Sequence, residues 1–268
     1  MLKLGSVRRF TIPFAEVEHL IIVEDFHKAY DRTVAVAGIS FKVAGGQILG
    51  LVGRNGAGKT TTLRTLAGIV TPSRGSLSVA GFDLDRQAVE AKQRLAYVPD
   101  DPQLFADLTV DQHLAFTASA YRVSHPEQKS IELLQQFELV GKRAALARDL
   151  SRGMRQKLAI CCAYLHDPQA ILLDEPLTGL DPHGIRTLKQ SLLHRAEEGA
   201  AVIVSSHLLA MVEDICTHVF ILERGEQRFF GPLSEVFATF ALEGAQLSLE
   251  DVFFQAVGNS GHPAATPL

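Results

Sequence analysis

The stretch "GLVGRNGAGKTTTLRTL", residues 50–66, carries residue types spaced for binding phosphate. Gly53, Gly58, Lys59 and Thr60 fit the pattern G-x-x-x-x-G-K-[S/T]. Glycines let backbone N–H groups turn towards an anion, and a helix that follows presents its positive end to it. In such a loop the lysine reaches the β and γ phosphates, and the hydroxyl binds Mg²⁺. The sequence therefore predicts a nucleotide site.

The stretch "ILLDEP" supplies the carboxylates that a site for nucleotide and Mg²⁺ requires. Asp174 ends an apolar run, which predicts a place at the carboxyl edge of a sheet, where α/β folds bind ligands. There we expect it to hold Mg²⁺, directly or through water. We expect Glu175 to point away from the strand face of Asp174 and to orient or deprotonate an attacking water.

A third stretch, "DLSRGMRQKLAI" at residues 149–160, separates the classes of protein that use such a loop. It resembles the signature motif of ATP-binding-cassette (ABC) ATPases, usually LSGGQ followed by a basic residue and an apolar helix. The resemblance covers roughly residues 20–257, with the family's motifs in the family's order. It implies ATP and Mg²⁺ as ligands, and it is not shared by kinases, GTPases or helicases.

The resemblance implies further site residues. Tyr30 falls where the family stacks an aromatic ring on adenine, with strand-edge packing as the alternative. His207, in "VIVSSH", falls at the switch-histidine position, with an ordinary sheet-end histidine as the alternative. Asp181, in "LTGLDP", falls in a dimer-contact loop and is also suited to cap the next helix. The expected nucleotide contacts are Tyr30, Gly53, Arg54, Asn55, Gly56, Ala57, Gly58, Lys59, Thr60, Thr61, Ser151, Gly153 and Asp181; the expected catalytic residues are Glu175 and His207, and the expected metal ligands are Thr60, Asp174 and Asp100.

In this family two ATPase domains face each other head to tail, and the signature segment explains why. A helix that starts at Ser151 has free N–H groups and a positive end, and Gly153 permits close backbone approach. One chain folds this helix away from its own phosphate loop, so each signature closes on the γ-phosphate of the other copy. The resemblance therefore implies a second ATPase subunit, identical or different, with ATP joining the two and hydrolysis separating them.

The sequence departs from the family pattern at three positions. Arg152 and Met154 replace a glycine and the last letter of LSGGQ, and we expect the added charge of Arg152 to be tolerated beside an anion site. Asp100 falls where the family usually has the glutamine of the lever, "YVPDDPQLFADLTV". An aspartate can meet Mg²⁺ through water, but it cannot donate an amide hydrogen bond.

Within the family, "LSRGMRQKLAI", "YVPDDP" and "LEDVFFQAVG" most resemble the ATPases of bacterial ABC-2-type exporters. Those ATPases are separate chains that dock on a membrane permease. The resemblance implies a permease partner, no nucleic acid, and a cytoplasmic place on the inner face of the membrane. We expect the helical insertion and the lever around residues 97–107 to receive the permease's cytoplasmic helix.

Two other classes of function stay open. One is a soluble ABC ATPase that acts on the ribosome or DNA, although the chain has one cassette and no heptad run. The other is a nucleotide-binding module without turnover, although Lys59, Asp174, Glu175 and His207 are all present.

The apolar pattern predicts the elements that position these residues. Strand, glycine loop and helix follow one another around the phosphate loop, and apolar strands alternate with helices from residue 170 onwards, which predicts a parallel sheet covered on both faces. Thr109 and Gln112 form a predicted capping box in a helical stretch. The predicted fold is an α/β P-loop NTPase core of ABC ATPase type, mainly a parallel sheet with flanking helices, an N-terminal antiparallel β part and an inserted all-helical subdomain. The predicted divisions are an extension at 1–20, expected to be disordered, an ABC ATPase domain at 21–238 with the helical subdomain at about 104–167, and an accessory segment and tail at 239–268.

Bulk composition fits this prediction. The 268 residues are 47% hydrophobic, enough for a full core, and the net charge of −4 argues against a surface that coats nucleic acid. No apolar run approaches the ~20 residues of a spanning helix. Cys161, Cys162 and Cys216 lack the spacing of a metal site, so we expect buried thiols.

Overall fold

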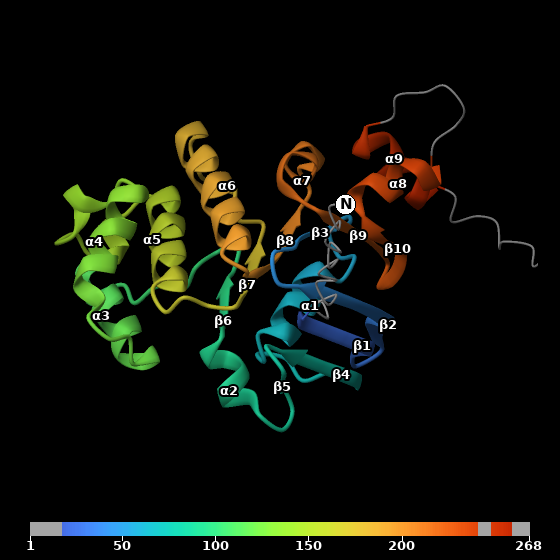
Figure 1. The fold of residues 1–268 in the computed structure, drawn as a ribbon, viewed down its shortest axis with the longest axis horizontal. Helices are drawn as coiled ribbons and strands as arrows, with labels where there is room; N and C mark the ends of the chain where they lie inside the picture. The colour runs from blue at the N-terminus through green and yellow to red at the C-terminus, as the bar shows by residue number, and fades with distance from the viewer. Residues whose placement is uncertain (1–17, 241–247, 259–268) are drawn as a thin grey trace, which may run out of the picture.

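The computed structural model describes residues 18–240 and 248–258. Within these residues the chain forms a six-stranded sheet and a four-stranded sheet, with helices on both faces of the larger one (Figure 1). Most of the predicted N-terminal extension and the last ten residues of the predicted tail lie outside the described residues, so these two predictions remain untested.

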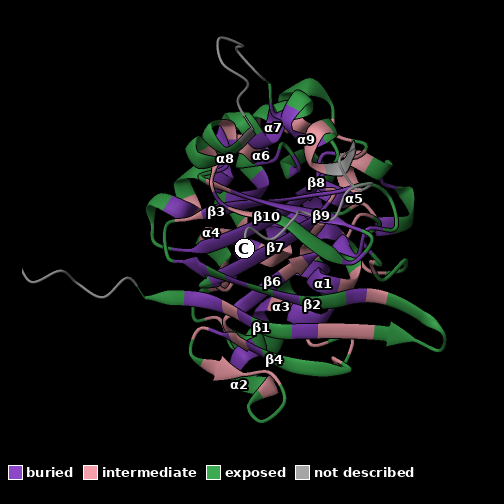
Figure 2. Ribbon diagram, turned by 90° about the vertical axis from the view of Figure 1, so that its right-hand side faces the viewer, coloured by how far each residue is buried: buried purple, intermediate pink, exposed green. Residues whose placement is uncertain are grey.

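The larger sheet has the strand order β10-β9-β3-β8-β7-β6. All neighbouring pairs run parallel except the β9–β10 hairpin, which turns at Gly225. Every residue of the three central strands β3, β7 and β8 is buried, and Figure 2 shows buried residues following these strands. The strands are β3 (Ile48–Val52), β6 (Leu95–Val98), β7 (Ala170–Asp174), β8 (Ala201–Ser206), β9 (His218–Glu223) and β10 (Glu226–Pro232).

The smaller sheet is antiparallel, in the order β2-β1-β4-β5, and it comes from the N-terminal part of the chain. One apolar cluster joins it to the larger sheet and includes Leu63 and Leu66 of helix α1 (Lys59–Leu66), so α1 packs between the sheets. The strands are β1 (His19–Tyr30), β2 (Thr33–Ala44), β4 (Arg74–Val79) and β5 (Phe82–Asp83), and α2 (Ala88–Gln93) leads from β5 to β6. Both sheets confirm the predicted fold class.

Helices α3 (Val110–Tyr121), α4 (Pro126–Gln136) and α5 (Arg152–Tyr164) gather at one end of the molecule (Figure 1), within the range predicted as the helical subdomain. The predicted capping box begins α3: the Thr109 N–H donates to Gln112 Oε1 (2.8 Å), and the Gln112 N–H donates to Thr109 Oγ1 (3.2 Å). Two 3₁₀ turns, Val140–Lys142 and Ala147–Asp149, connect α4 to α5.

Helix α4 is shorter than its sequence indicates. The stretch "PEQKSIELLQQFEL" has apolar residues at helical spacing and predicts a helix that ends near Gly141, but α4 ends at Gln136. Glu138 has a φ of 59°, a left-handed conformation that cannot continue a right-handed helix. The helix therefore stops although the residues that follow include good helix formers.

The remaining helices complete the cover of the larger sheet. They are α6 (Pro182–Glu197), α7 (Leu209–Ile215), α8 (Leu233–Phe240) and α9 (Leu249–Gly258). None of the helices in the described part of the chain is both long enough and apolar enough to span a membrane. Cys161 and Cys216 are buried and Cys162 is largely buried, as predicted, and burial raises the pKa of Cys162 to about 11 and that of Cys216 to about 12.

Candidate nucleotide site

A cavity of about 260 Å³ opens where β3 and β7 end at the carboxyl edge of the larger sheet. It contains most of the predicted phosphate-loop residues together with three of the four predicted acidic residues. The lining residues are Ala35, Arg54, Asn55, Gly56, Gly58, Lys59, Thr60, Thr61, Asp100, Asp174 and Glu175.

Glycine is required at two positions of the phosphate loop by close backbone approach. A Cβ atom on Gly53 would lie 2.4 Å from the carbonyl oxygen of Leu222, and one on Gly58 would lie 2.6 Å from that of Ala35. Gly58 also has a φ of 110° and precedes α1 without a side-chain cap. The amino end of α1 therefore faces the cavity with its N–H groups free of a capping side chain, which suits an oxyanion.

The amine of Lys59 is held inside the loop. Its side chain is only 6% exposed, and Nζ donates to the carbonyl oxygens of Gly53 (2.6 Å) and Arg54 (3.3 Å). The same Nζ lies 3.8 Å from Oε1 of Glu175. The loop thus fixes a buried positive charge at the wall of the cavity, where it is available to a phosphate.

Asp174 is fixed by the neighbouring strand. Its side chain is 2% exposed, and it accepts a hydrogen bond from Ser205 Oγ at 2.5 Å. The parallel register pairs Asp174 of β7 with Ser205 of β8, so the two side chains meet at the same level of the sheet. Ser205 Oγ also accepts from the N–H of Glu175 (3.0 Å), so one hydroxyl holds both consecutive acids.

Glu175 lines the same cavity as Asp174, which corrects the expectation that the two side chains diverge. Its φ of 47° is left-handed, an uncommon conformation for a residue other than glycine, and it turns the chain where β7 ends. Oε2 of Glu175 lies 2.7 Å from Nδ1 of His207 and accepts from the His207 N–H (3.3 Å). Lys59 and His207 thus contact the two oxygens of this carboxylate separately.

Six of the predicted nucleotide contacts do not line this cavity: Gly53 and Ala57, which belong to the phosphate loop itself, and four residues outside the loop. Ser151 caps α5 by accepting from the Met154 N–H (3.3 Å), and Asp181 caps α6 by accepting from the Gly184 N–H (2.8 Å). This second hydrogen bond, with the nearby charge of Lys157, lowers the pKa of Asp181. The other two residues are Tyr30, at the end of β1 with the Lys28 amine 4.8 Å from its ring centre, and Gly153, in the first turn of α5.

The donor set fits Mg²⁺. The Thr60 hydroxyl and the Asp174 and Asp100 carboxylates all line one cavity, and Mg²⁺ prefers such oxygen ligands together with phosphate oxygens and water. The lining carries three carboxylates against the two cations Arg54 and Lys59. A polyanionic nucleotide that enters this cavity needs additional positive charge beside those carboxylates.

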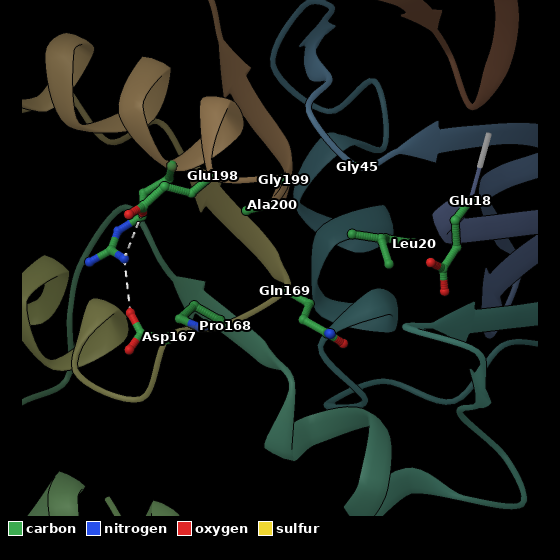
Figure 3. Close-up of a pocket in the computed structure, with 10 residues that line it drawn as sticks. Glu18, Leu20, Gly45, Asp167, Pro168, Gln169, Glu198, Gly199 and Ala200 are labelled. Carbon is green, nitrogen blue, oxygen red and sulfur yellow. Dashed lines mark hydrogen bonds and ion pairs between the residues drawn. The ribbon is translucent and has the colours of Figure 1, made fainter. Parts of the chain in front are cut away.

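A second cavity, of about 460 Å³, lies at the opposite edge of the larger sheet (Figure 3). It lies where β7 and β8 begin, whereas open α/β sheets bind ligands where parallel strands end. Its cation is already paired, since Arg195 donates to Asp167 (2.9 Å) and Glu198 (3.3 Å). Size alone therefore does not mark the nucleotide site.

The sequence interpretation missed Ser205 and Ala35. Ser205 stands in "VIVSSH", which was singled out only for its histidine. The signal for Ser205 was the pair of apolar strands that end in Asp174 and Ser205, but it requires knowing that these strands are neighbours. Ala35 reaches the cavity from β2, and no local pattern indicates that contact.

Comparisons with known proteins agree with this geometry. The sequence model of the family described as "ABC transporter" matches residues 36–178. The ABC-type transporter ATP-binding protein EcsA of Bacillus subtilis (strain 168) is 35% identical over 246 residues, which cover 91% of this chain and 99% of that protein. The Nod factor export ATP-binding protein I of Rhizobium meliloti (strain 1021) is 33% identical, over 83% of this chain and 67% of that protein.

A solved structure described as the ATP-binding subunit of an ABC transporter superposes with a TM-score of 0.84 at 33% identity, over 88% of this chain and 99% of that one. The sequence, the fold and the cavity thus lead to the same family. The chain belongs to the ABC transporter family, as one of its ATP-binding subunits, and is an ATPase.

Proposed function

We propose that this subunit hydrolyses ATP with Mg²⁺ to drive a separate membrane permease of the ABC-2 exporter type, as one of two ATPase subunits. The observation that carries the proposal is the convergence of Lys59, Asp174 and Glu175 on one cavity, with His207 on the Glu175 carboxylate. Lys59 is placed to contact the phosphates, and Glu175 to accept a proton from an attacking water. His207 holds the Glu175 carboxylate in position.

Magnesium would be held by Thr60 and Asp174, with Asp100 beside them, and would supply positive charge to the phosphate oxygens. The hydrogen bond from Ser205 occupies one oxygen of Asp174 and leaves its other oxygen for the metal or its water. These assignments are consistent with the donor set of the cavity.

The place of the signature supports a second subunit. Ser151 and Gly153 lie outside the cavity of their own chain, and the amino end of α5 carries unpaired helix N–H groups apart from the one that Ser151 caps. In our proposal this end of α5 completes the cavity of the partner subunit. In the same proposal Asp181 caps α6 in its own chain, and the loop that contains Asp181 faces the partner subunit.

Exposed aromatic side chains support docking on a permease. Phe105 and Phe116 are 55% and 53% exposed, and their rings meet edge to face with centroids 5.2 Å apart. They join the lever segment to α3, the region expected to receive a cytoplasmic helix of the permease. In our proposal this subunit docks on the permease at the inner face of the membrane and therefore lies in the cytoplasm. One relative carries export in its name.

Replacing Lys59 tests the nucleotide site directly. We expect Lys59→Ala to lose measurable ATP binding in equilibrium titrations, because the loop then offers no buried cation to the phosphates. Lys42→Ala is the matched control, since Lys42 is a half-exposed lysine on β2 that pairs with Glu24 at 3.9 Å, away from the cavity. Micromolar ATP affinity in folded Lys59→Ala protein would contradict the assignment.

The permease proposal has its own experiment. We expect the chain to co-purify from membranes with one multi-spanning protein, and the Phe105→Ser/Phe116→Ser double variant to lose that partner while it still binds ATP. Recovery of ribosomes or DNA in place of a membrane protein would overturn the proposal.

A further inference from the structure

Asp100 and Arg152, two of the three departures from the family's sequence pattern, contact each other. Nη2 of Arg152 lies 3.2 Å from Oδ1 of Asp100, across 52 positions of sequence. Asp100 follows β6 and lines the nucleotide cavity, whereas Arg152 is the first residue of α5. The ion pair therefore connects the cavity to the amino end of the signature helix within one chain.

Two glycines make room for this contact. A Cβ atom on Gly179, which has a φ of 82°, would lie 3.1 Å from both Cγ and Cδ of Arg152. A Cβ atom on Gly153 would lie 2.4 Å from the carbonyl oxygen of Gly179. The start of α5 thus packs directly on the loop between β7 and α6, and the stem of Arg152 crosses Gly179 to reach Asp100.

The charges around Asp100 set up a competition. Arg152 approaches its carboxylate from α5, whereas the cavity that Asp100 lines also contains Thr60 and Asp174, the proposed magnesium ligands. A magnesium ion or its water shell in the cavity attracts the same carboxylate. Both side chains of the pair are about half exposed, at 50% and 48%, and a pair of this kind is weak enough for a divalent cation to displace.

We propose that Arg152 is a positioning residue that holds Asp100 in an intrachain latch, and that Mg²⁺-nucleotide opens the latch by drawing the Asp100 carboxylate away from Arg152 and towards the metal. Opening frees the Arg152 guanidinium at the amino end of α5, so that this side chain is available to meet a second copy. The latch, defined as the Arg152–Asp100 ion pair, rests on the proposed function for the cavity and its metal, and it gives the two sequence departures one joint role.

A double-mutant cycle on ADP binding tests the latch. ADP is used because it lacks the γ-phosphate that would join two copies. The affinity for ADP is measured by titration with excess Mg²⁺ and with EDTA, in the unchanged protein, Arg152→Gln, Asp100→Asn and the double variant. With Mg²⁺, we expect Arg152→Gln to tighten ADP binding when Asp100 is present. The factor of tightening should be about 1.5- to 5-fold larger than the factor that the same change produces in the Asp100→Asn background. With EDTA the two backgrounds should respond equally.

A second readout needs no nucleotide. In urea unfolding of the nucleotide-free protein, the pair should show a coupling of about 1.5- to 5-fold in the unfolding constant, and Mg²⁺-ADP should remove it. Arg148→Gln is the matched control, because Arg148 pairs with Asp107 at the surface close to the start of α5 and does not line the cavity.

The outcomes separate the latch from the proposed function. Equal responses in both backgrounds with Mg²⁺, or a coupling that Mg²⁺-ADP leaves unchanged, would overturn the latch while ADP binding still supports the nucleotide site. Failure of the unchanged protein to bind ADP or ATP at all would instead overturn the proposed function.

Discussion

At the scale of single residues, Glu175 is the most constrained group of the cavity. Its backbone is left-handed, its N–H is bonded to Ser205, and its two carboxylate oxygens lie against Lys59 and His207. A residue in a sparsely populated conformation persists only where its surroundings determine it. Here the surroundings turn the carboxylate towards the phosphate loop, which is the geometry that a general base for water requires.

Glu175→Gln should therefore separate binding from turnover. The amide keeps the shape of the side chain but cannot accept a proton, so we expect hydrolysis to fall by roughly 10²–10⁴-fold. ATP affinity should change little, because Lys59 and the loop remain. Phosphate release and equilibrium ATP binding, measured on the same preparation, check both parts, and undiminished phosphate release would remove Glu175 from the reaction.

At the scale of elements, the phosphate loop offers a matched pair of glycines. Gly56 and Gly58 both have positive φ, at 80° and 110°, but a Cβ atom would meet open space at Gly56 and the Ala35 carbonyl oxygen at 2.6 Å at Gly58. At both positions a side chain costs about 1–2 kcal/mol because of the backbone conformation. Only at Gly58 would the added Cβ atom also collide with the Ala35 carbonyl oxygen.

Alanine at each position should show that difference. We expect Gly56→Ala to lower the free energy of unfolding by about 1–2 kcal/mol. Gly58→Ala should lower it further and should abolish ATP binding, because the loop must move away from β2. Urea unfolding curves and ATP titrations of the two variants provide the test; equal destabilisation would show that the contact with Ala35 relaxes without cost.

The elements with a local sequence pattern were the ones that the sequence predicted. The glycine loop, the Asp174 strand and the capping box at Thr109 were predictable because each pattern is local and has one physical explanation. The early end of α4 was not, since the left-handed Glu138 carries no special residue type. The Asp100–Arg152 pair was not predictable either, because it depends on how the end of β6 meets the start of α5 in space.

At the scale of the whole molecule, the proposed site is incomplete in one chain. The signature residues Ser151 and Gly153 lie outside the cavity that holds Lys59 and Glu175. Catalysis by the purified subunit should then depend on encounters between chains.

Dilution measures that dependence. When the protein is diluted 100-fold through the concentrations at which two chains dissociate, we expect the ATPase rate per chain to fall steadily, because each active assembly contains two chains. A permease-bound sample serves as the control, since its subunits stay together. A rate per chain that stays constant in a strictly monomeric sample would exclude the two-chain site.

Helices α3, α4 and α5 have no apolar interior of their own: Leu114, Leu134 and Leu158 belong to the same buried cluster as Ile171 and Leu188 of β7 and α6. Close-packed interiors resist compression and pass displacement on. Helices α3, α4 and α5 are therefore packed rigidly against the larger sheet and do not form a separate lobe. A displacement applied at their outer surface, where Phe105 and Phe116 are exposed, should therefore reach the strand that ends in Asp174.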